Sequence, residues 1–271
     1  MTAEFKLRSK LLMSYETQNL KVPVESDDYN ECSAFVIEAV KGLMTDALNS
    51  GRNKILIHTN LKRGLPMENI NKVAGPFVEA WAVEVFQDAV EDPANKYRLI
   101  NVEAQERLNM SDVILQFKRQ RKRQTSVTAD VDVKATSEDF VNAGKSPNIT
   151  SYARIRTAYV KDPDFLFVIL SLKHRVFCEK NQSTGMMEGV MEVVDHNAYD
   201  LKHLSGPDIS YNPSLGTGQL QVRDIHYVTT ESRTTWEFCQ LLDRKYLASS
   251  RRSFDQWRKL ALQYGWIKDE E

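Results

Sequence analysis

The sequence has few of the residue types that bind soft metals or form disulfides. Its 271 residues include three cysteines, Cys32, Cys178 and Cys239, whose wide spacing matches no zinc-ligand pattern. The five histidines show no metal-ligand spacing either. We therefore expect reduced thiols in a cytoplasmic protein, and we assign none of the histidines to a metal.

Long apolar runs are also missing. No stretch approaches the roughly 18 apolar residues that a transmembrane helix needs. The first residues, MTAEFKLRSKLLMSYE, lack an apolar core followed by a small-residue cleavage site. The chain has no internal repeat, no low-complexity tract and no Gly/Ser/Pro-rich linker. These absences predict a single domain over residues 1–271, with no membrane partner.

Neither sign of charge is in large excess, because the formal net charge is −1. This balance argues against a polycation that coats nucleic acid without sequence preference, although a local cluster of cations is enough for phosphate contacts. The segment KRQRKR (118–123) is such a cluster. The ordinary expectation for it is the charged tip of a hairpin, and contact with a DNA backbone is the alternative.

What is present is a mixture of helix and strand patterns. Apolar residues recur at helical spacing over 32–49 and 69–90, and the second helix is expected to break or start near Gly75 and Pro76. Further helices are expected over 151–160 (with Ser146 as N-cap), 234–249 and 253–266. Strands are expected over 97–104, 111–118, 128–137, 165–172 and 218–228. Residues 55–61 form a short strand or a turn, and 186–204 is ambiguous. The pattern predicts an α/β (α+β) fold, a mixed sheet flanked by helices.

Two carboxylates and an ammonium alternate in the stretch ADVDVKATS (129–137). In a strand, Asp130, Asp132 and Lys134 point to one face. Asp112 opens the preceding strand, so antiparallel pairing would bring it close to Asp132. Mg²⁺ prefers one or two carboxylates together with waters and phosphate oxygens, and it stabilises the charge that develops on a phosphate during hydrolysis. The pattern is therefore compatible with Mg²⁺-dependent phosphodiester hydrolysis, in which Lys134 lies beside the attacking water.

Two other interpretations fit the same stretch. A solvated edge strand can carry such a row of charges without any catalytic role. Asp130-Val131-Asp132 is also an acid-x-acid pattern of the kind that holds a metal and a nucleotide sugar in glycosyltransferases. The glycosyltransferase interpretation leaves Asp112 and Lys134 without a role, and no Gly-rich nucleotide-binding turn follows an early strand. Spacing alone does not decide between a nuclease site and a solvated row.

Longer motifs extend the pattern. Asp112-Val113-Ile114-Leu115, Asp132-Val133-Lys134 and Lys145-Ser146-Pro147-Asn148-Ile149 occur in this order and at a spacing that resembles the PD-(D/E)xK nucleases. More narrowly, the chain resembles the HpaI/HincII-like type II restriction endonucleases. This similarity includes LPMENINKVAGPFVEAWAVEVF, LINVEAQERL, VDVKATS, GKSPNITS, RIRTAYVKDP, SYNPSLGTGQLQ and RTTWEFCQLLD, so it covers nearly the whole chain.

The resemblance implies an activity. Such enzymes are Mg²⁺-dependent homodimers that cut both strands of double-stranded DNA at a short palindrome, as part of a restriction-modification system. For the HpaI type the palindrome is GTTAAC, cut at its centre to leave blunt ends. Two alternatives remain open: a DNA-binding protein that has lost cleavage, and a structure-directed repair nuclease on the same fold. The retained Asp112, Asp132 and Lys134 argue against the first, and the length of the similarity argues against the second.

The resemblance also assigns catalytic roles. Asp112, Asp132 and the backbone carbonyl of Val133 are expected to bind the metal, with Lys134 beside the attacking water. Glu79 is a candidate supporting carboxylate, with an exposed helix carboxylate as the alternative. Ser111 replaces the signature proline before the first acid. Asp130 has no role in the family pattern, and we expect it to be a solvated bystander.

DNA contacts are expected from two segments. By resemblance, the first comprises Gly144, Lys145, Ser146 and Asn148, of which Asn148 is the strongest base reader because an amide can both donate to and accept from a base edge. Lys145 stands where HincII-type enzymes carry an intercalating glutamine, which puts that wedge in doubt.

The second segment contributes Asn212, with Tyr211 and Gln219 as weaker candidates. The alternative for these three is a turn whose polar side chains satisfy the local backbone. Arg154 and Arg156 are expected to be phosphate anchors or solvated side chains.

Overall fold

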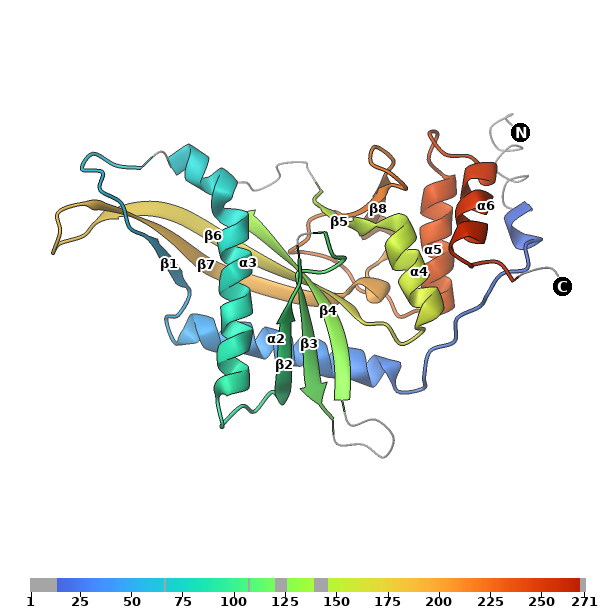
Figure 1. Cartoon of the computed structure of the whole chain (residues 1–271), viewed down its shortest axis with the longest axis horizontal. Coiled ribbons are helices and arrows are strands. Elements are labelled where there is room, and N and C mark those ends of the chain that lie inside the picture. Colours follow the sequence, from blue (N-terminus) through green and yellow to red (C-terminus); the bar gives the residue numbers. More distant parts are fainter. Residues whose placement is uncertain (1–13, 66, 107, 120–125, 139–145, 269–271) are drawn as a thin grey trace.

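The computed structural model describes residues 14–268 except 66, 107, 120–125 and 139–145. Its centre is a six-stranded sheet in the order β1-β7-β6-β4-β3-β2. These strands are β1 (Lys54–Ile57), β2 (Leu99–Ala104), β3 (Val113–Lys118), β4 (Ser126–Ser137), β6 (Phe167–Lys180) and β7 (Met187–Asp200). β4 pairs antiparallel with β3 and parallel with β6, so the sheet is mixed. Figure 1 shows β6 and β7 curving away to the left as a long arm that β1 joins.

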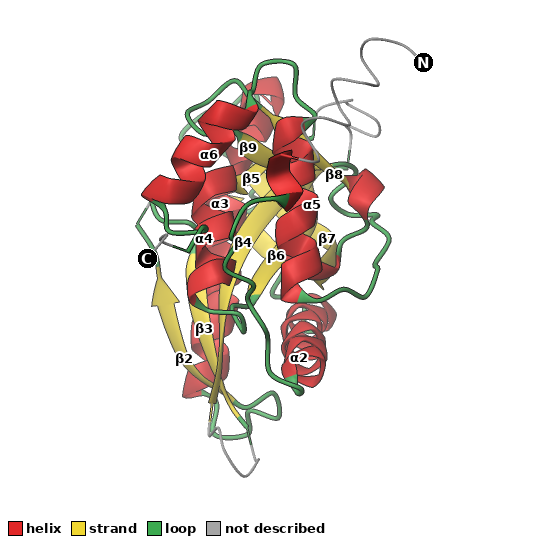
Figure 2. Ribbon diagram, turned by 90° about the vertical axis from the view of Figure 1, so that its right-hand side faces the viewer, coloured by secondary structure: helices red, strands yellow, loops and turns green. Residues whose placement is uncertain are grey.

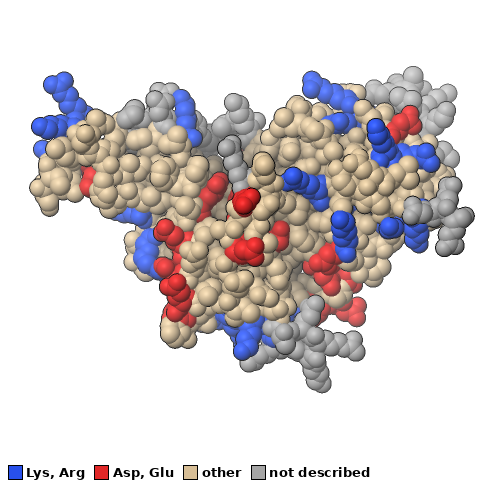
Figure 3. Space-filling model, viewed as in Figure 1, with Lys and Arg blue, Asp and Glu red and all other residues tan. Residues whose placement is uncertain are grey.

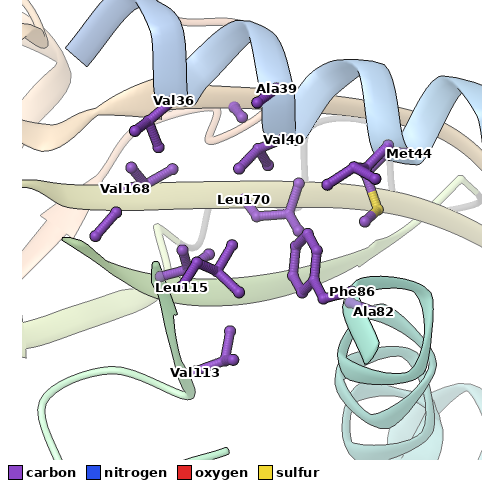
Figure 4. Packing of buried hydrophobic residues seen from close by; sticks show 14 of the residues in the cluster. Val36, Ala39, Val40, Met44, Ala82, Phe86, Val113, Leu115, Val168 and Leu170 are labelled. Atoms are coloured by element: carbon purple, nitrogen blue, oxygen red, sulfur yellow. The ribbon is translucent and has the colours of Figure 1, made fainter. Parts of the chain in front are cut away.

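Two helices bury one face of this sheet. Helices α2 (Tyr29–Asn49) and α3 (Met67–Glu91) share a core with β3, β4 and β6. Figure 4 shows Val40 of α2 and Phe86 of α3 pointing toward Leu170 on β6. All three side chains are fully buried, and removal of such apolar surface from water is the dominant favourable contribution to folding.

A smaller sheet lies on the other side of β6. It has the order β5-β9-β8 and consists of β5 (Asn148–Ser151), β8 (Ile209–Asn212) and β9 (Gln219–Val222). Helices α4 (Tyr152–Lys161), α5 (Thr235–Leu247) and α6 (Phe254–Gln263) complete this part, which appears in the upper half of Figure 2, above α2. Two 3₁₀ turns, Leu201–His203 and Gly206–Asp208, connect β7 to β8. Because the predicted helices flank a mixed sheet, the expected α+β fold class is confirmed.

Strand β6 contributes to both cores. Val168 and Leu170 belong to the cluster beneath α2 and α3, whereas Phe167 and Ile169 belong to the cluster beneath the small sheet and α5. This alternation explains the continuous apolar run at 165–172, since a strand covered on both faces needs no polar side.

Two strands have other bounds than predicted: β6 continues past residue 172 to Lys180, and β1 ends at Ile57 and not at 61. Three other predicted elements also differ from the structure. Helix α3 continues through Pro76 without a break. The buried side chains of Ala74 and Val78, on either side of Pro76, hold it in place despite the lost backbone donor. Strand β9 ends at Val222 and does not extend to 228, and residues 187–200, which were ambiguous, form β7.

The third difference concerns the start of α4. Ser146 does not cap this helix, because Asn148–Ser151 forms β5, in which Asn148 pairs with Gln221. The helix begins at Tyr152, with Ser151 at the N-cap. Ile149 and Thr150 are buried, and their β-branched side chains favour a strand over a first helical turn.

β3 and β4 form the expected hairpin, and residues 120–123 of the basic segment lie outside the described residues. β3 and β4 pair antiparallel up to Lys118 and Ser126. Arg119 is nearly buried and donates through Nη1 to Asp28 Oδ2 (2.9 Å) and through Nη2 to Glu31 Oε2 (3.3 Å). This end of β3 is opposite to the end that carries Asp112. Within the described ranges, none of the helices combines the length and the apolar character that crossing a bilayer requires.

Candidate active site and recognition sheet

Pairing between β3 and β4 brings the first acid to the strand that carries the second. Val113 lies opposite Val131, and the backbone N–H of Asp112 donates to the carbonyl of Val131 at 3.0 Å. The Asp112 side chain then reaches along β4, where its Oδ2 accepts from the backbone N–H of Val133 at 2.7 Å. The predicted proximity of Asp112 to the Asp132-Val133-Lys134 stretch is therefore present in the structure.

Asp132 is a buried carboxylate with a cation beside it. The residue is 4% exposed, and Lys134 Nζ donates to its Oδ1 at 2.7 Å. Burial raises the pKa of Asp132 to about 7; the Lys134 ammonium opposes this shift, and the negative charge of Asp112 adds to it. The other oxygen, Oδ2, is buried and has no hydrogen-bond partner among the residues that the structure describes. A buried carboxylate oxygen without a donor is costly unless a cation approaches it.

Glu79 on α3 faces the same group. Burial raises its pKa, Asp112 adds to the increase through its negative charge, and Lys134 acts in the opposite direction. Glu79 in turn contributes to the raised pKa of Asp132. The Glu79 carboxylate is thus half-buried and within electrostatic range of the two acids, which disfavours the alternative of an exposed helix side chain.

The oxygen donors of Asp112, Asp132 and Val133 suit a hard divalent ion. In the described part of the chain, no three His, Cys, Asp or Glu side chains form a group that could hold a metal alone. Asp112 and Asp132 supply two carboxylates, and Val133, whose carbonyl is the expected third donor, directly follows Asp132 in β4. One or two carboxylates completed by waters are typical of Mg²⁺ sites, whereas transition-metal sites use imidazole or thiolate ligands. The unpaired Oδ2 of Asp132 fits this interpretation.

Asp130 differs from its expectation as a solvated bystander. Its carboxylate is partly buried and accepts a hydrogen bond from Ser111 Oγ at 3.0 Å, and burial raises its pKa. Ser111 occupies the position of the family proline and precedes Asp112. The fold therefore holds this carboxylate against the bend that carries the first acid.

The predicted DNA-contacting residues from distant segments converge on the small sheet. Asn148 starts β5 and is exposed. Tyr211 and Asn212 end β8, and Asn212 lies opposite Gln219 at the start of β9. The backbone carbonyl of Ser146 accepts a hydrogen bond from Gln221 Nε2 at 3.0 Å, which ties the preceding segment to the same sheet. Gly144 and Lys145 lie outside the described residues.

Two of these candidates also have local partners. Asn212 Oδ1 accepts from the backbone N–H of Ser214 at 3.0 Å, which is the turn interaction considered as its alternative. Tyr211 Oη donates to the carbonyl of Thr217 at 2.7 Å, and burial raises its pKa to about 12. Asn148, in contrast, is exposed, and it remains the best placed of the predicted readers.

Arg156 is not a phosphate anchor. It is fully buried, and its Nη2 lies 3.2 Å from Asp243 Oδ2. Tyr152 Oη also donates to Asp243, at 2.6 Å, so this network joins α4 to α5 inside the second core. Arg154 is exposed and donates to the carbonyl of Leu108 at 2.7 Å.

Two residues near the small sheet were not predicted from the sequence. Gln221 follows Gln219 at the alternate position of QLQV and lies opposite Asn148; this alternation was the signal that could have identified it. Arg252 contacts the turn before β9 from a loop about forty residues later, and no spacing in the sequence indicates that contact.

Comparisons with known proteins identify the family of this chain. The family model described as type II restriction endonuclease HpaI matches residues 16–265. The type II restriction enzyme HpaI of Haemophilus parainfluenzae is 55% identical over 257 residues, covering 95% of this chain and 100% of the relative. Among solved structures, the NlaIV restriction endonuclease aligns over 84% of this chain and 90% of its own, with a TM-score of 0.40 and 10% identity. On the family match and the 55% identity, the chain belongs to the HpaI family of type II restriction endonucleases.

Proposed function

We propose that this enzyme hydrolyses both strands of double-stranded DNA at the palindrome GTTAAC, cutting at its centre to leave blunt ends, with Mg²⁺ as cofactor. The observation that carries the proposal is the grouping of Asp112, Asp132 and Lys134 on paired strands, with one buried carboxylate oxygen unsatisfied. Membership of the HpaI family supports the choice of substrate.

Each residue of the group has a chemical task. Asp112, Asp132 and the carbonyl of Val133 would hold the Mg²⁺, which, when bound, stabilises charge on the phosphate and acidifies a water. Lys134 would hold the attacking water and a phosphate oxygen through its ammonium group. Its hydrogen bond to Asp132 keeps it beside the reacting atoms before DNA arrives. Glu79 would add negative charge behind the site and favour cation binding.

Recognition would use the small sheet. Asn148 offers an exposed amide that can pair with a base edge, and Asn212 and Gln219 lie together at the end of β8 and β9. Ser146, together with Gly144 and Lys145, would approach the DNA from the segment before β5, and Tyr211 would support Asn212. Figure 3 shows Asp and Glu side chains near the middle of the face seen in Figure 1, with many Lys and Arg side chains toward its two ends, where a polyanion meets less repulsion.

The symmetry of the proposed target sequence implies a homodimer. A palindrome presents the same bases and the same scissile bond on both strands, so a two-fold homodimer can read both halves and cut both strands. Such an enzyme would act in the cytoplasm as the cleaving half of a restriction-modification system, whose methyltransferase protects the host's own sites.

A plasmid digest tests the proposal. Supercoiled plasmid with a single GTTAAC is incubated with the protein in Mg²⁺, and the ends are sequenced. We expect blunt ends between the central T and A, and no cleavage by a Lys134→Ala control. Binding without any cleavage by the unaltered protein would contradict the proposal, as would cuts confined to flaps or nicks.

A further inference from the structure

The turn between β8 and β9 presents an exposed tip on a fixed base. It spans residues 213–218, between Asn212 and Gln219. Ser214, Leu215 and Gly216 are exposed, and Leu215 leaves 56% of its surface open. The base is held by neighbouring elements: the backbone N–H of Tyr152 donates to the carbonyl of Gly218 at 3.0 Å. The tip is therefore accessible, while the two ends of the turn join the small sheet at Asn212 and Gln219.

Arg252 donates hydrogen bonds to this turn from outside the small sheet. It lies in the loop between α5 and α6, and its guanidinium donates three hydrogen bonds. Nε reaches Tyr211 Oη at 2.8 Å, and Nη2 reaches the carbonyls of Pro213 at 2.9 Å and Gly216 at 2.8 Å. Only a planar fork of N–H groups satisfies three separate acceptors in this way; a lysine ammonium in the same place cannot reproduce it.

Tyr211 links the guanidinium to the far side of the turn. Its hydroxyl accepts from Arg252 and donates to the carbonyl of Thr217 at 2.7 Å. Gly218 has a φ of +93°, and a Cβ on it would overlap the Tyr211 ring. The ring also packs against Tyr246 on α5, with centroids 5.4 Å apart, and the Arg252 guanidinium lies 5.4 Å from the Tyr246 ring centre. The turn thus has one conformation fixed by contacts at its start, middle and end.

We propose that Arg252 is a positioning residue for sequence recognition: it holds the β8–β9 turn so that Asn212 and Gln219 meet the base edges without first having to be ordered. This inference rests on the proposed function. Surface turns are ordinarily mobile, and ordering one on binding reduces affinity for the correct site. A turn held in advance retains that affinity, and the benefit is largest for the sequence whose bases match the held geometry.

The test measures discrimination in binding, separately from cleavage. The protein is titrated in Ca²⁺ with a duplex carrying GTTAAC and with duplexes that differ from it by one base pair. Arg252→Lys is compared with Arg251→Ala, which removes a neighbouring exposed charge, and with the unaltered protein. We expect Arg252→Lys to reduce the ratio of the two affinities about tenfold, the scale of one lost base contact. Arg251→Ala should leave the ratio unchanged.

Each outcome decides between the alternatives. An unchanged ratio in Arg252→Lys overturns the inference, and so does an equal loss in both variants, which would indicate charge alone. If Arg252→Lys does not fold, as judged by its thermal transition, Tyr211→Phe removes one acceptor and should reduce the ratio by a smaller factor; no reduction there overturns the inference. An unaltered protein that binds all duplexes alike overturns the proposed function, and the role of Arg252 with it.

Discussion

The two regions proposed to act on DNA, the strands β3 and β4 with the candidate active site and the small sheet β5-β9-β8 as the recognition sheet, are built in different ways. Asp112, Asp132 and Lys134 come from two strands joined by one hairpin, and backbone pairing alone brings them together. The recognition sheet takes its three strands from segments around residues 148, 209 and 219, and side chains such as those of Gln221 and Arg252 tie the adjoining segment and turn to it. The proposed active site is therefore encoded locally, whereas the proposed reading surface depends on contacts between residues far apart in the sequence.

The largest effect is expected from substitutions of Asp132 and Lys134, which should reduce cleavage but leave DNA binding in place. Asp132→Ala and Lys134→Ala should each reduce cleavage by about 10³-fold or more, because both remove groups that touch the reacting atoms. Binding of GTTAAC duplex in Ca²⁺ should stay within a few-fold of the unaltered protein, since the recognition sheet is intact. Gel analysis of cleavage and anisotropy of binding provide the two measurements. Full activity in either variant would refute the site.

The next effect concerns the stability of the metal-free protein. The pKa of Asp132 is raised to about 7 in the fold, above its unfolded value, so the folded state retains a proton that the unfolded state releases. The contribution of Asp132 to stability should therefore fall as pH rises from about 4 to about 7, and Asp132→Asn should remove that contribution. At pH 8 in EDTA, we expect the Asn variant to be more stable by roughly 2 to 4 kcal/mol, since one pKa unit corresponds to about 1.4 kcal/mol.

Chemical denaturation at pH 4 and pH 8 checks this expectation. Asp27→Asn, at an exposed position, serves as the control and should follow the unaltered protein. Equal stability of the Asp132→Asn and unaltered proteins at pH 8 would mean that the buried carboxylate is not destabilising.

A change in the reading surface should leave the chemistry in place. Asn148→Ala should weaken binding of the GTTAAC duplex by about 1 to 3 kcal/mol, the usual size of a bidentate amide–base contact, and leave binding to unrelated duplex unchanged. Competition binding at fixed salt measures both. An equal loss on all duplexes would show that Asn148 contacts the backbone and not a base.

The smallest effect is expected from the hydrogen bond behind the first acid. Ser111→Ala removes the donor to Asp130, and we expect about a tenfold increase in the Mg²⁺ concentration needed for half-maximal cleavage, because the groups that orient a ligand usually have effects of this size. Ser111→Thr keeps a hydroxyl at this position and should stay closer to normal Mg²⁺ dependence. Identical Mg²⁺ dependence in Ser111→Ala would return Asp130 to the status of a bystander.

The sequence predicted the nuclease strands well for a physical reason. Strand alternation and a hairpin are local properties, so the shared face of Asp130, Asp132 and Lys134 could be read directly. The motifs at 144–149 and 211–219 identified candidate readers through family resemblance, and the structure brings Asn148, Asn212 and Gln219 into one sheet.

Other features could not be predicted from the sequence. β5 has four residues, too few for a periodic signal, and Ser146-Pro147 before it has the form of a helix start. Arg156 occurs on a helix where phosphate contact was plausible; its burial depends on Asp243, 87 residues later in the chain. Arg252 is another such case, because its partners at residues 211 to 216 are determined by tertiary packing.

Strand β6 has one more consequence. Its successive side chains alternate between the core beneath α2 and α3 and the core beneath the small sheet and α5. Neither part can therefore slide along the other without removing an apolar side chain from its own core. The pleat of this strand thus fixes the distance between the proposed reading surface and the proposed site of cleavage. One residue inserted in β6 would reverse this alternation, so that Phe167 and Val168 would each face the opposite core.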